Sequence, residues 1–346
     1  MRSIAVIGGD SRLGTRVVAM LRDDPRVKRL VVFGAQVAPS PGCEVHAVDL
    51  AGADLRSYLA DIDVVVDCAT RVDPIPEPVL MERMTTTTTD NLMRACELVS
   101  RVVVASTTSV YGAWANAASP LAESATIRPN PGFASATHAA EIERRWLAWS
   151  MGHAPRESVI LRIAPIVAPG SSDLLAVLQA GRPPVVPRGV APVVQVVHVD
   201  DAARAVVAGI FEFPAGVVNI AADGAASRDE VTAMLPGRHQ VRLPEELLAR
   251  ALDALWRTGV GDVPAAALAF LEQPPVVATD KARELGWIPA FTNMHAIAEC
   301  MPEAAYVLPP EAKRIVVRTG IAAGVVLAGA ALLVRRSRRH RRRSRR

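Results

Sequence analysis

The first fourteen residues, MRSIAVIGGDSRLG, constrain the fold of this chain more than any other stretch. The apolar run at residues 3–7 is typical of a strand that is buried on both faces. Gly8 and Gly9 follow it and allow a tight turn that brings the backbone close to a ligand. A helix with apolar residues on one face then begins near Arg12. Because a helix N-terminus offers N–H groups and partial positive charge, this strand–turn–helix unit predicts a pyrophosphate site.

The spacing of the glycines specifies the turn further. Gly8 and Gly14 fit the form G-x-x-G-x-x-G, in which Ser11 takes the place of the middle glycine. We predict that the cofactor-binding residues of this turn are Gly8, Gly9, Ser11, Arg12, Leu13 and Gly14. An ordinary strand–turn–helix unit without a ligand is the alternative, because glycine turns also serve purely structural purposes.

Short apolar segments alternate with helical segments over the first half of the chain. The segments that we predict as strands are residues 3–7, 29–33, 44–50, 63–67, 101–105 and 159–163. Helical patterns cover residues 12–22, 80–99 and 136–151. A further helix over residues 202–210 is predicted to be capped by Asp200 and Asp201. This alternation predicts an α/β fold, a Rossmann-type doubly wound parallel sheet.

The pattern changes after about residue 170, where shorter and proline-rich segments begin. We predict a dinucleotide-binding domain over residues 1–170 and a small substrate lobe over residues 171–312, interleaved with it. An apolar helix over residues 313–334 and an arginine-rich tail over residues 335–346 follow.

The apolar segment at residues 315–334 contains one charge, Arg318, and nine arginines follow it in residues 335–346. Twenty helical residues span about 30 Å, the thickness of a bilayer core. We therefore predict a transmembrane or membrane-inserted helix that anchors a cytoplasmic domain, with the arginines on anionic membrane lipid. A soluble amphipathic helix or a buried helix is the alternative. The topology stays open, because one full span cannot leave both the domain and the tail in the cytoplasm.

The formal net charge of +4 combines two parts of opposite sign. Residues 313–346 hold 12 of the 39 Lys and Arg and no acid, so residues 1–312 carry 27 bases against 35 acids, a charge of −8. An acidic body argues against the basic face that nucleic acid needs. Nucleic acid is the alternative partner of the arginine run, but we favour the membrane because the apolar segment directly precedes the run. The four cysteines are scattered without metal-site spacing, and no metal is predicted.

Eight segments, in order, resemble the extended short-chain dehydrogenase/reductase family, within the NAD-dependent epimerase/dehydratase group that includes UDP-galactose 4-epimerases. They are IGGDSRLG (7–14), AVDL (47–50), DVVVDCAT (63–70), VVVASTTSVYG (102–112), LRIAPIVAPG (161–170), VVHVDDAARAV (196–206), VVNIAADG (217–224) and ARELGWIP (282–289). The resemblance covers roughly residues 3–295. It implies an NAD or NADP cofactor, a nucleotide-sugar substrate and a homodimer.

The resemblance also implies a catalytic tyrosine and lysine in the motif Y-x-x-x-K, with an acid four residues later. With Pro131 and Glu141 setting the register, Phe133 stands at the tyrosine position and Thr137 at the lysine position. Neither side chain has the ionisable group that this chemistry needs. Thr107 is the one family-like catalytic residue that is kept.

Four other polar residues lie near these positions. Thr85 aligns with a family asparagine. We interpret His138 as a surface histidine, Tyr111 as a packing residue and Asp67 as a hydrogen-bond partner of the cofactor loop. A catalytic role is the alternative for each of these three, since all can titrate.

The family's other cofactor contacts match three further segments. The resemblance assigns the adenine contact to Asp49 and Leu50, the loop beside the cofactor to Ala69 and Thr70, and the segment beside the nicotinamide to Pro165. A dinucleotide is therefore the expected partner.

The preference between NAD and NADP stays open at this stage. Gly34 stands where NAD-preferring members carry an acid for the ribose hydroxyls. Arg12 facing a 2′-phosphate would favour NADP, and an exposed arginine at the helix start is the alternative.

Two functions are compatible with the sequence. The first is a membrane-associated, NAD(P)-binding relative of the epimerases that lacks the Tyr/Lys pair and acts as a sensor or scaffold. The second is an active nucleotide-sugar epimerase, dehydratase or reductase with non-standard catalytic residues, with a lipid-linked sugar as a further candidate substrate. A purely structural partner protein is a third hypothesis.

Overall fold

Seven parallel strands form the central sheet of the computed structural model, which describes residues 1–152, 155–170, 172–181, 185–234, 241–259 and 261–306. Their order across the sheet is β11-β6-β5-β4-β1-β2-β3. The strands are β1 (Arg2–Ile7), β2 (Val27–Gly34), β3 (Glu44–Ala47), β4 (Val64–Asp67), β5 (Arg101–Thr107), β6 (Glu157–Ile163) and β11 (Gly216–Ile220). The order reverses at β1, which marks the switch point where ligands bind in such sheets. The predicted Rossmann-type sheet is confirmed.

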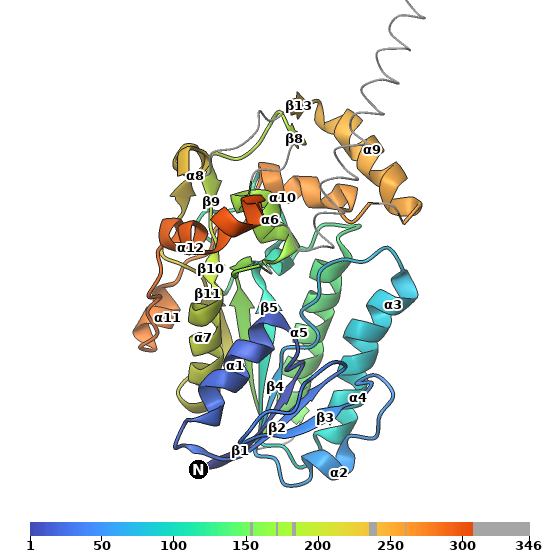
Figure 1. Cartoon of the computed structure of the whole chain (residues 1–346), viewed down its shortest axis with the longest axis vertical. Helices are drawn as coiled ribbons and strands as arrows, with labels where there is room; N and C mark the ends of the chain where they lie inside the picture. The colour runs from blue at the N-terminus through green and yellow to red at the C-terminus, as the bar shows by residue number, and fades with distance from the viewer. Residues whose placement is uncertain (153–154, 171, 182–184, 235–240, 260, 307–346) are drawn as a thin grey trace, which may run out of the picture.

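Helices cover both faces of this sheet (Figure 1). Successive residues of a strand point to opposite faces. Ile4 and Val6 of β1 lie in an apolar cluster with α1 (Arg12–Arg22) and α7 (Val199–Phe211). Ala5 and Ile7 lie in a second cluster, whose helices are α2 (Arg56–Leu59), α4 (Thr88–Ala95) and α5 (Ala134–Gly152). One short apolar strand therefore contributes to two cores, as the doubly wound prediction requires.

The helix predicted over residues 80–99 is interrupted in its middle. It consists of α3 (Pro78–Glu82), a π-helical turn η1 (Arg83–Thr87) and α4, which ends at Ala95. The Thr85 hydroxyl donates to the Met81 carbonyl at 2.6 Å, and the Thr89 hydroxyl donates to the Thr85 carbonyl at 3.1 Å. Hydroxyl groups that bond to backbone carbonyls one turn earlier distort a helix. The predicted helix is therefore present, but it contains a π-helical turn and ends at Ala95 instead of Val99.

The start of α7 also differs from its prediction. His198 is the capping residue, and its Nδ1 accepts from the Asp200 backbone N–H at 3.2 Å. Asp201, predicted as a cap, is buried and accepts the backbone N–H groups of Ala290 and Phe291. The helix therefore begins at Val199, three residues earlier than predicted.

Smaller elements gather beyond the carboxyl ends of the strands, where the chain leaves the sheet and returns to it (Figure 1). Three two-stranded sheets lie here, formed by β7 (Ile166–Val167) with β10 (Val197–His198), β9 (Val193–Val194) with β12 (Ala226–Ser227), and β8 (Val185–Pro187) with β13 (Val241–Leu243). Besides α7, the helical elements after β6 in the described part of the chain are α6 (Leu174–Ala180), α8 (Arg228–Met234), α9 (Glu245–Arg257), η3 (Ala265–Leu268), α10 (Ala269–Glu272), α11 (Asp280–Glu284) and α12 (Asn293–Tyr306). A short helix, η2 (Thr108–Tyr111), follows β5.

The predicted apolar helix of residues 313–334 and the arginine tail of residues 335–346 lie outside the described residues. Among the residues that are described, none of the helices has the length and apolar character needed to cross a membrane.

Candidate functional site

The glycine turn after β1 packs more closely than any side chain would allow. Gly8 has a φ of +80°, and a Cβ there would lie 2.7 Å from backbone atoms of Ala69. A Cβ on Gly14 would lie 2.0 Å from the Gly8 carbonyl oxygen, and one on Gly9 would lie 2.2 Å from Val32 Cγ1. The turn therefore presses directly on α1 and on the loop after β4. This close backbone packing fits a pyrophosphate cradle.

Ser11, at the place of the middle glycine, caps the helix that follows. Its Oγ accepts from the Gly14 backbone N–H at 3.0 Å and donates to the Gly8 carbonyl at 2.7 Å. The side chain of Leu13 is buried in the core between α1 and the sheet, and its contact with a cofactor stays a prediction. The serine keeps the turn closed through side-chain hydrogen bonds, which a glycine could not make.

A pocket beside this turn brings together five of the predicted residues. They are Arg12, Thr70, Thr107, Phe133 and Pro165. They come from the loops after β1, β4, β5 and β6 and from the turn before α5. The pocket thus lies at the carboxyl edge of the sheet, where Rossmann folds bind their ligands.

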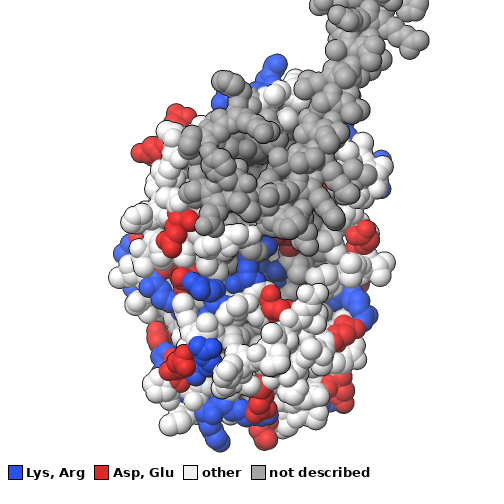
Figure 2. All heavy atoms as spheres, viewed as in Figure 1, with Lys and Arg blue, Asp and Glu red and all other residues white. Residues whose placement is uncertain are grey.

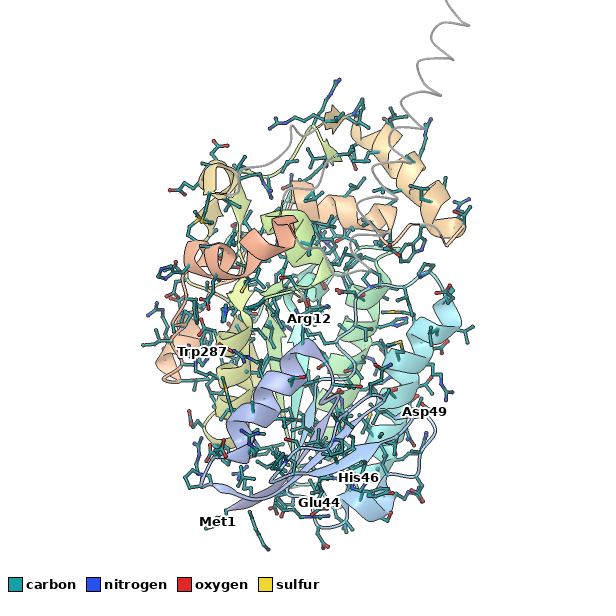
Figure 3. All side chains as sticks on the ribbon, viewed as in Figure 1. Met1, Arg12, Glu44, His46, Asp49 and Trp287 are labelled. Atoms are coloured by element: carbon teal, nitrogen blue, oxygen red, sulfur yellow. The ribbon has the colours of Figure 1, made fainter. Side chains whose placement is uncertain are left out.

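A cluster of charged residues, Arg12, Arg71, Asp73 and Asp173, lines one side of the pocket. The Arg12 guanidinium pairs with Asp173 and, at 3.3 Å, with Asp73. Arg71 pairs with the same Asp173 and donates to the Ser106 carbonyl at 2.8 Å. Figure 3 labels Arg12 near the centre of the molecule, and Figure 2 shows basic side chains gathered in the same region of that face.

The charge state of Asp173 is set by its two arginine partners. Burial disfavours its carboxylate, but the attraction of Arg71 and Arg12 outweighs burial and holds the pKa of Asp173 below its ordinary value. Asp173 also accepts from the Ile166 backbone N–H at 2.9 Å. Arg12 is the first residue of α1 and is half-buried, so the interpretation of it as an exposed arginine was wrong, while its contact with a 2′-phosphate stays a prediction. Its guanidinium neutralises carboxylates in the pocket.

Helix α5 presents a different set of residues to the pocket from the one that we predicted. Ser135, Ala139 and Ile142 line it at helical spacing. Phe133 also lines it, from the turn before the helix, with its ring 4.8 Å from that of Phe270. Thr137, predicted at the lysine position, is exposed on the other side of the helix. The residue one turn from Ser135 in the pocket is therefore Ala139.

The buried acid of α5 supports this shift of two residues. Glu143 has no exposed surface and accepts from the Arg162 guanidinium at 2.9 and 3.0 Å. Glu141, which set the predicted register, instead pairs with Arg144 and Arg145 at the surface, and both lower the pKa of Glu141 to about 2. The series Ser135, Ala139 and Glu143 has the same four-residue spacing as the motif Y-x-x-x-K-x-x-x-E.

Thr107 lies in the pocket at the end of β5. Its Oγ1 accepts from the Ser109 backbone N–H at 3.2 Å and lies 3.1 Å from Ser109 Oγ. The Ser135 hydroxyl faces the same pocket and is buried without a hydrogen bond to any described residue. Hydroxyl groups therefore remain where the family's chemistry would occur.

The polar residues near the motif have mixed outcomes. Asp67 accepts from the backbone N–H groups of Ala69 and Thr70 at 3.1 and 3.2 Å, so its role in holding the loop is confirmed. Burial raises the pKa of Asp67. Tyr111 is buried and donates to Asn219 at 2.8 Å, which agrees with a packing role.

The interpretation of His138 as a surface residue was wrong. Its side chain is half-buried, and its Nδ1 lies 2.7 Å from the Thr85 hydroxyl. Because Thr85 Oγ1 donates to the Met81 carbonyl, it accepts from His138. Burial lowers the pKa of His138. Thr85 and His138 thus tie the π-helical turn to α5.

The predicted adenine contacts lie away from the pocket, towards the β3 edge of the sheet. Asp49 pairs with Arg83 and accepts from the Ala51 backbone N–H at 3.2 Å, and Figure 3 shows it well separated from Arg12. The Leu50 carbonyl accepts from Asn91 at 2.8 Å. Gly34 ends β2.

Among the pocket residues that sequence reasoning missed are three charged residues and the serine on α5. Arg71 and Asp73 follow directly after the predicted loop of Ala69 and Thr70, so their position along the chain was a usable signal. Asp173 and Ser135 carry no motif, and only the fold brings them to the pocket.

Comparisons with known proteins agree with this architecture. The sequence profile of the NAD dependent epimerase/dehydratase family matches residues 4–221. No curated protein sequence matches the chain. Among solved structures, the UDP-glucose 4-epimerase from Thermotoga maritima superposes with a TM-score of 0.69 at 15% identity, over 89% of this chain and 100% of that one.

Two further epimerase structures are similarly close. The UDP-glucuronic acid 4-epimerase from Bacillus cereus, solved with NAD, has a TM-score of 0.66 at 17% identity, over 86% of this chain and 96% of its own. The UDP-Glc/GlcNAc 4-epimerase from Campylobacter jejuni has a TM-score of 0.67 at 16% identity, over 88% and 99%. At these identities the likeness concerns the fold.

The matched profile spans the strands, the glycine turn and most of the loops that line the pocket. It supports the predicted NAD-type cofactor, which the close packing of the turn also fits. The chain belongs to the NAD-dependent epimerase/dehydratase family.

Proposed function

We propose that this protein binds NAD or NADP at the carboxyl edge of its sheet as a sensor or scaffold and lacks the proton relay of its family. The observation that carries the proposal is the pocket-facing side of α5, where Ser135 and Ala139 stand at the spacing of the tyrosine and lysine. The cradle for the dinucleotide is kept, and the groups that would move a proton are absent from this side of the described helix.

The residues that would hold the cofactor all follow strands at the carboxyl edge of the sheet. The turn of Gly8, Ser11 and Gly14 would bind the pyrophosphate, while Thr70 and Pro165 would flank the nicotinamide end. A bound dinucleotide supplies a hydride acceptor or donor. The charged side of the pocket, where Arg12 and Arg71 pair with Asp73 and Asp173, would face a second ligand.

The absent proton relay follows from side-chain chemistry. The family needs a tyrosine whose pKa is lowered by a nearby lysine. A serine hydroxyl at Ser135 is a much weaker acid than a phenol, and Ala139 offers no charge to stabilise its anion. Phe133 and Thr137 do not supply these groups either, so the conclusion holds in both registers.

An active enzyme with non-standard residues is the second candidate. The observation in its favour is that hydroxyl groups of Thr107, Ser109 and Ser135 line the same pocket as Arg71 and Asp73. Its substrate would be a nucleotide sugar, because the similar structures named above are UDP-sugar epimerases, or a lipid-linked sugar.

Titration calorimetry of the full chain with NAD⁺, NADH, NADP⁺ and NADPH tests the first function. We expect at least one dinucleotide to bind and no turnover of UDP-glucose or UDP-glucuronic acid. Turnover that Thr107→Ala abolishes would favour the enzyme. Absence of binding by all four dinucleotides would contradict both functions.

We also propose that residues 313–346 hold the protein at a cytoplasmic membrane surface. Support comes from the apolar run at residues 315–334 and the nine arginines that follow it. Flotation of the full chain with phosphatidylglycerol vesicles, beside phosphatidylcholine vesicles, tests it. A variant with the nine arginines replaced by serine should lose the preference for anionic lipid. A homodimer is proposed by family resemblance, and sedimentation velocity would test it.

A further inference from the structure

At the end of β2, the side chain of Asp10 lies directly beside Gly34. A Cβ built on Gly34 would lie 2.4 Å from Asp10 Oδ1 and 2.7 Å from Asp10 Cγ. The carboxylate of Asp10 therefore occupies the space into which a side chain at Gly34 would project. Asp10 belongs to the glycine turn, so it reaches this space from the loop after β1.

A backbone hydrogen bond holds Asp10 in this position. Its Oδ2 accepts from the Gln36 N–H at 2.8 Å, which ties the turn to the segment after β2. Its Oδ1 is the oxygen that lies beside Gly34. Asp10 as a whole is exposed, so a ligand lying across the end of β2 can reach the carboxylate.

We propose that Asp10 supplies the ribose-binding carboxylate that Gly34 lacks and thereby selects NAD over NADP. This inference rests on the proposed dinucleotide binding. A carboxylate at the end of the second strand accepts hydrogen bonds from the ribose hydroxyls. The same charge repels a 2′-phosphate, so one group both attracts NAD and excludes NADP.

The position of Arg12 removes the main argument for NADP. Arg12 is the basic residue of the turn and the sequence-based candidate for a 2′-phosphate contact. Its guanidinium pairs with Asp173 and Asp73 in the pocket. The two neighbouring residues therefore point in different directions: Asp10 lies beside the end of β2, and Arg12 lies in the pocket.

The test measures the affinities of the full chain for NAD⁺ and NADP⁺ by titration calorimetry. Asp10→Asn removes the charge and keeps an acceptor for the Gln36 N–H. The double variant Asp10→Gly/Gly34→Asp moves the carboxylate to the end of β2. Thermal melting of each variant checks that it is folded.

We expect the wild type to bind NAD⁺ at least tenfold more tightly than NADP⁺. Asp10→Asn should weaken NAD⁺ about tenfold, the change expected for loss of a charged hydrogen bond, and should leave NADP⁺ unchanged or tighter. The double variant should regain the preference for NAD⁺.

Equal binding of both dinucleotides by the wild type, an unchanged ratio in Asp10→Asn, or no recovery in the double variant would overturn the role of Asp10 and leave dinucleotide binding intact. Failure of the wild type to bind either dinucleotide would overturn the proposed function and this inference with it. If Asp10→Asn does not fold, the ratio of the NAD⁺ and NADP⁺ affinities of the double variant tests the role of Asp10 on its own.

Discussion

The glycine turn and the pocket side of α5 lie beside the same pocket, but their residues are held in place to different degrees. The turn keeps Gly8 and Gly14 where a Cβ would strike backbone atoms at 2.7 and 2.0 Å. The helix has a buried acid, Glu143, and presents Ser135 and Ala139 to the pocket, which we propose stand in for the catalytic pair of the family. The comparison teaches that the glycines of the turn are fixed by close backbone packing, whereas the Ser135 hydroxyl on α5 has no hydrogen bond to any described residue that would fix it.

The largest expected effect concerns the buried pair that anchors α5. Glu143→Leu leaves the Arg162 guanidinium buried without its carboxylate, which we expect to cost about 3–5 kcal/mol of unfolding free energy. Denaturant unfolding followed by circular dichroism measures it. Replacing both residues, by Glu143→Leu/Arg162→Met, should recover most of the loss. A single variant that unfolds like the wild type would break the claim that this helix is fixed through Glu143.

The next effect concerns the turn. Gly14→Ala places a methyl group against the Gly8 carbonyl, and we expect a loss of about 1–3 kcal/mol together with weaker dinucleotide binding. Unfolding and calorimetry on one preparation measure both. Gly152→Ala is the matched control, because a Cβ added at Gly152 would meet nothing within 4 Å. Equal behaviour of the two variants would mean that the turn tolerates a side chain.

A third effect separates the two registers of the catalytic motif. Ser135→Tyr/Ala139→Lys puts the lysine into the pocket, where it should raise dinucleotide affinity about tenfold through charged hydrogen bonds. Phe133→Tyr/Thr137→Lys puts the lysine on the exposed side of the helix and should leave the affinity unchanged. The opposite result would restore the register set by Glu141.

The smallest expected effect is a change in how the free energy of unfolding depends on pH, through His138. Burial lowers the pKa of His138, so the folded state binds this proton less readily than the unfolded state. The folded state therefore has its full stability above the ordinary pKa of 6.5 and loses part of it as the pH falls below that value. His138→Gln should flatten the stability profile below about pH 6.5. His295→Gln, at an exposed position, is the control, and an unchanged profile in His138→Gln would contradict the prediction.

The strands were predictable because their residues are apolar, β-branched and bounded by turn residues. The runs at residues 63–67 and 101–105 needed no tertiary information, since a strand buried on both faces shows a continuous apolar run. The π-helical turn was not predictable, because it depends on which carbonyl each threonine hydroxyl reaches.

The sequence alone does not choose between the two registers on α5, for a related reason. Glu141 and Glu143 both satisfy spacings that the motif allows, and only burial separates them. Arg12 and Asp173 are 161 residues apart, so their pairing depends on the return of the chain to the sheet. Local patterns carry no information on such contacts.

The alternation within β1 makes the start of this chain sensitive to the insertion or deletion of single residues. Odd and even positions belong to different cores, with Ile4 and Val6 on one side and Ala5 and Ile7 on the other. A single-residue deletion inside the strand would exchange the two sets and also carry Gly8 out of phase with Ala69. The first seven residues therefore tolerate substitution by similar side chains, but not a change of length.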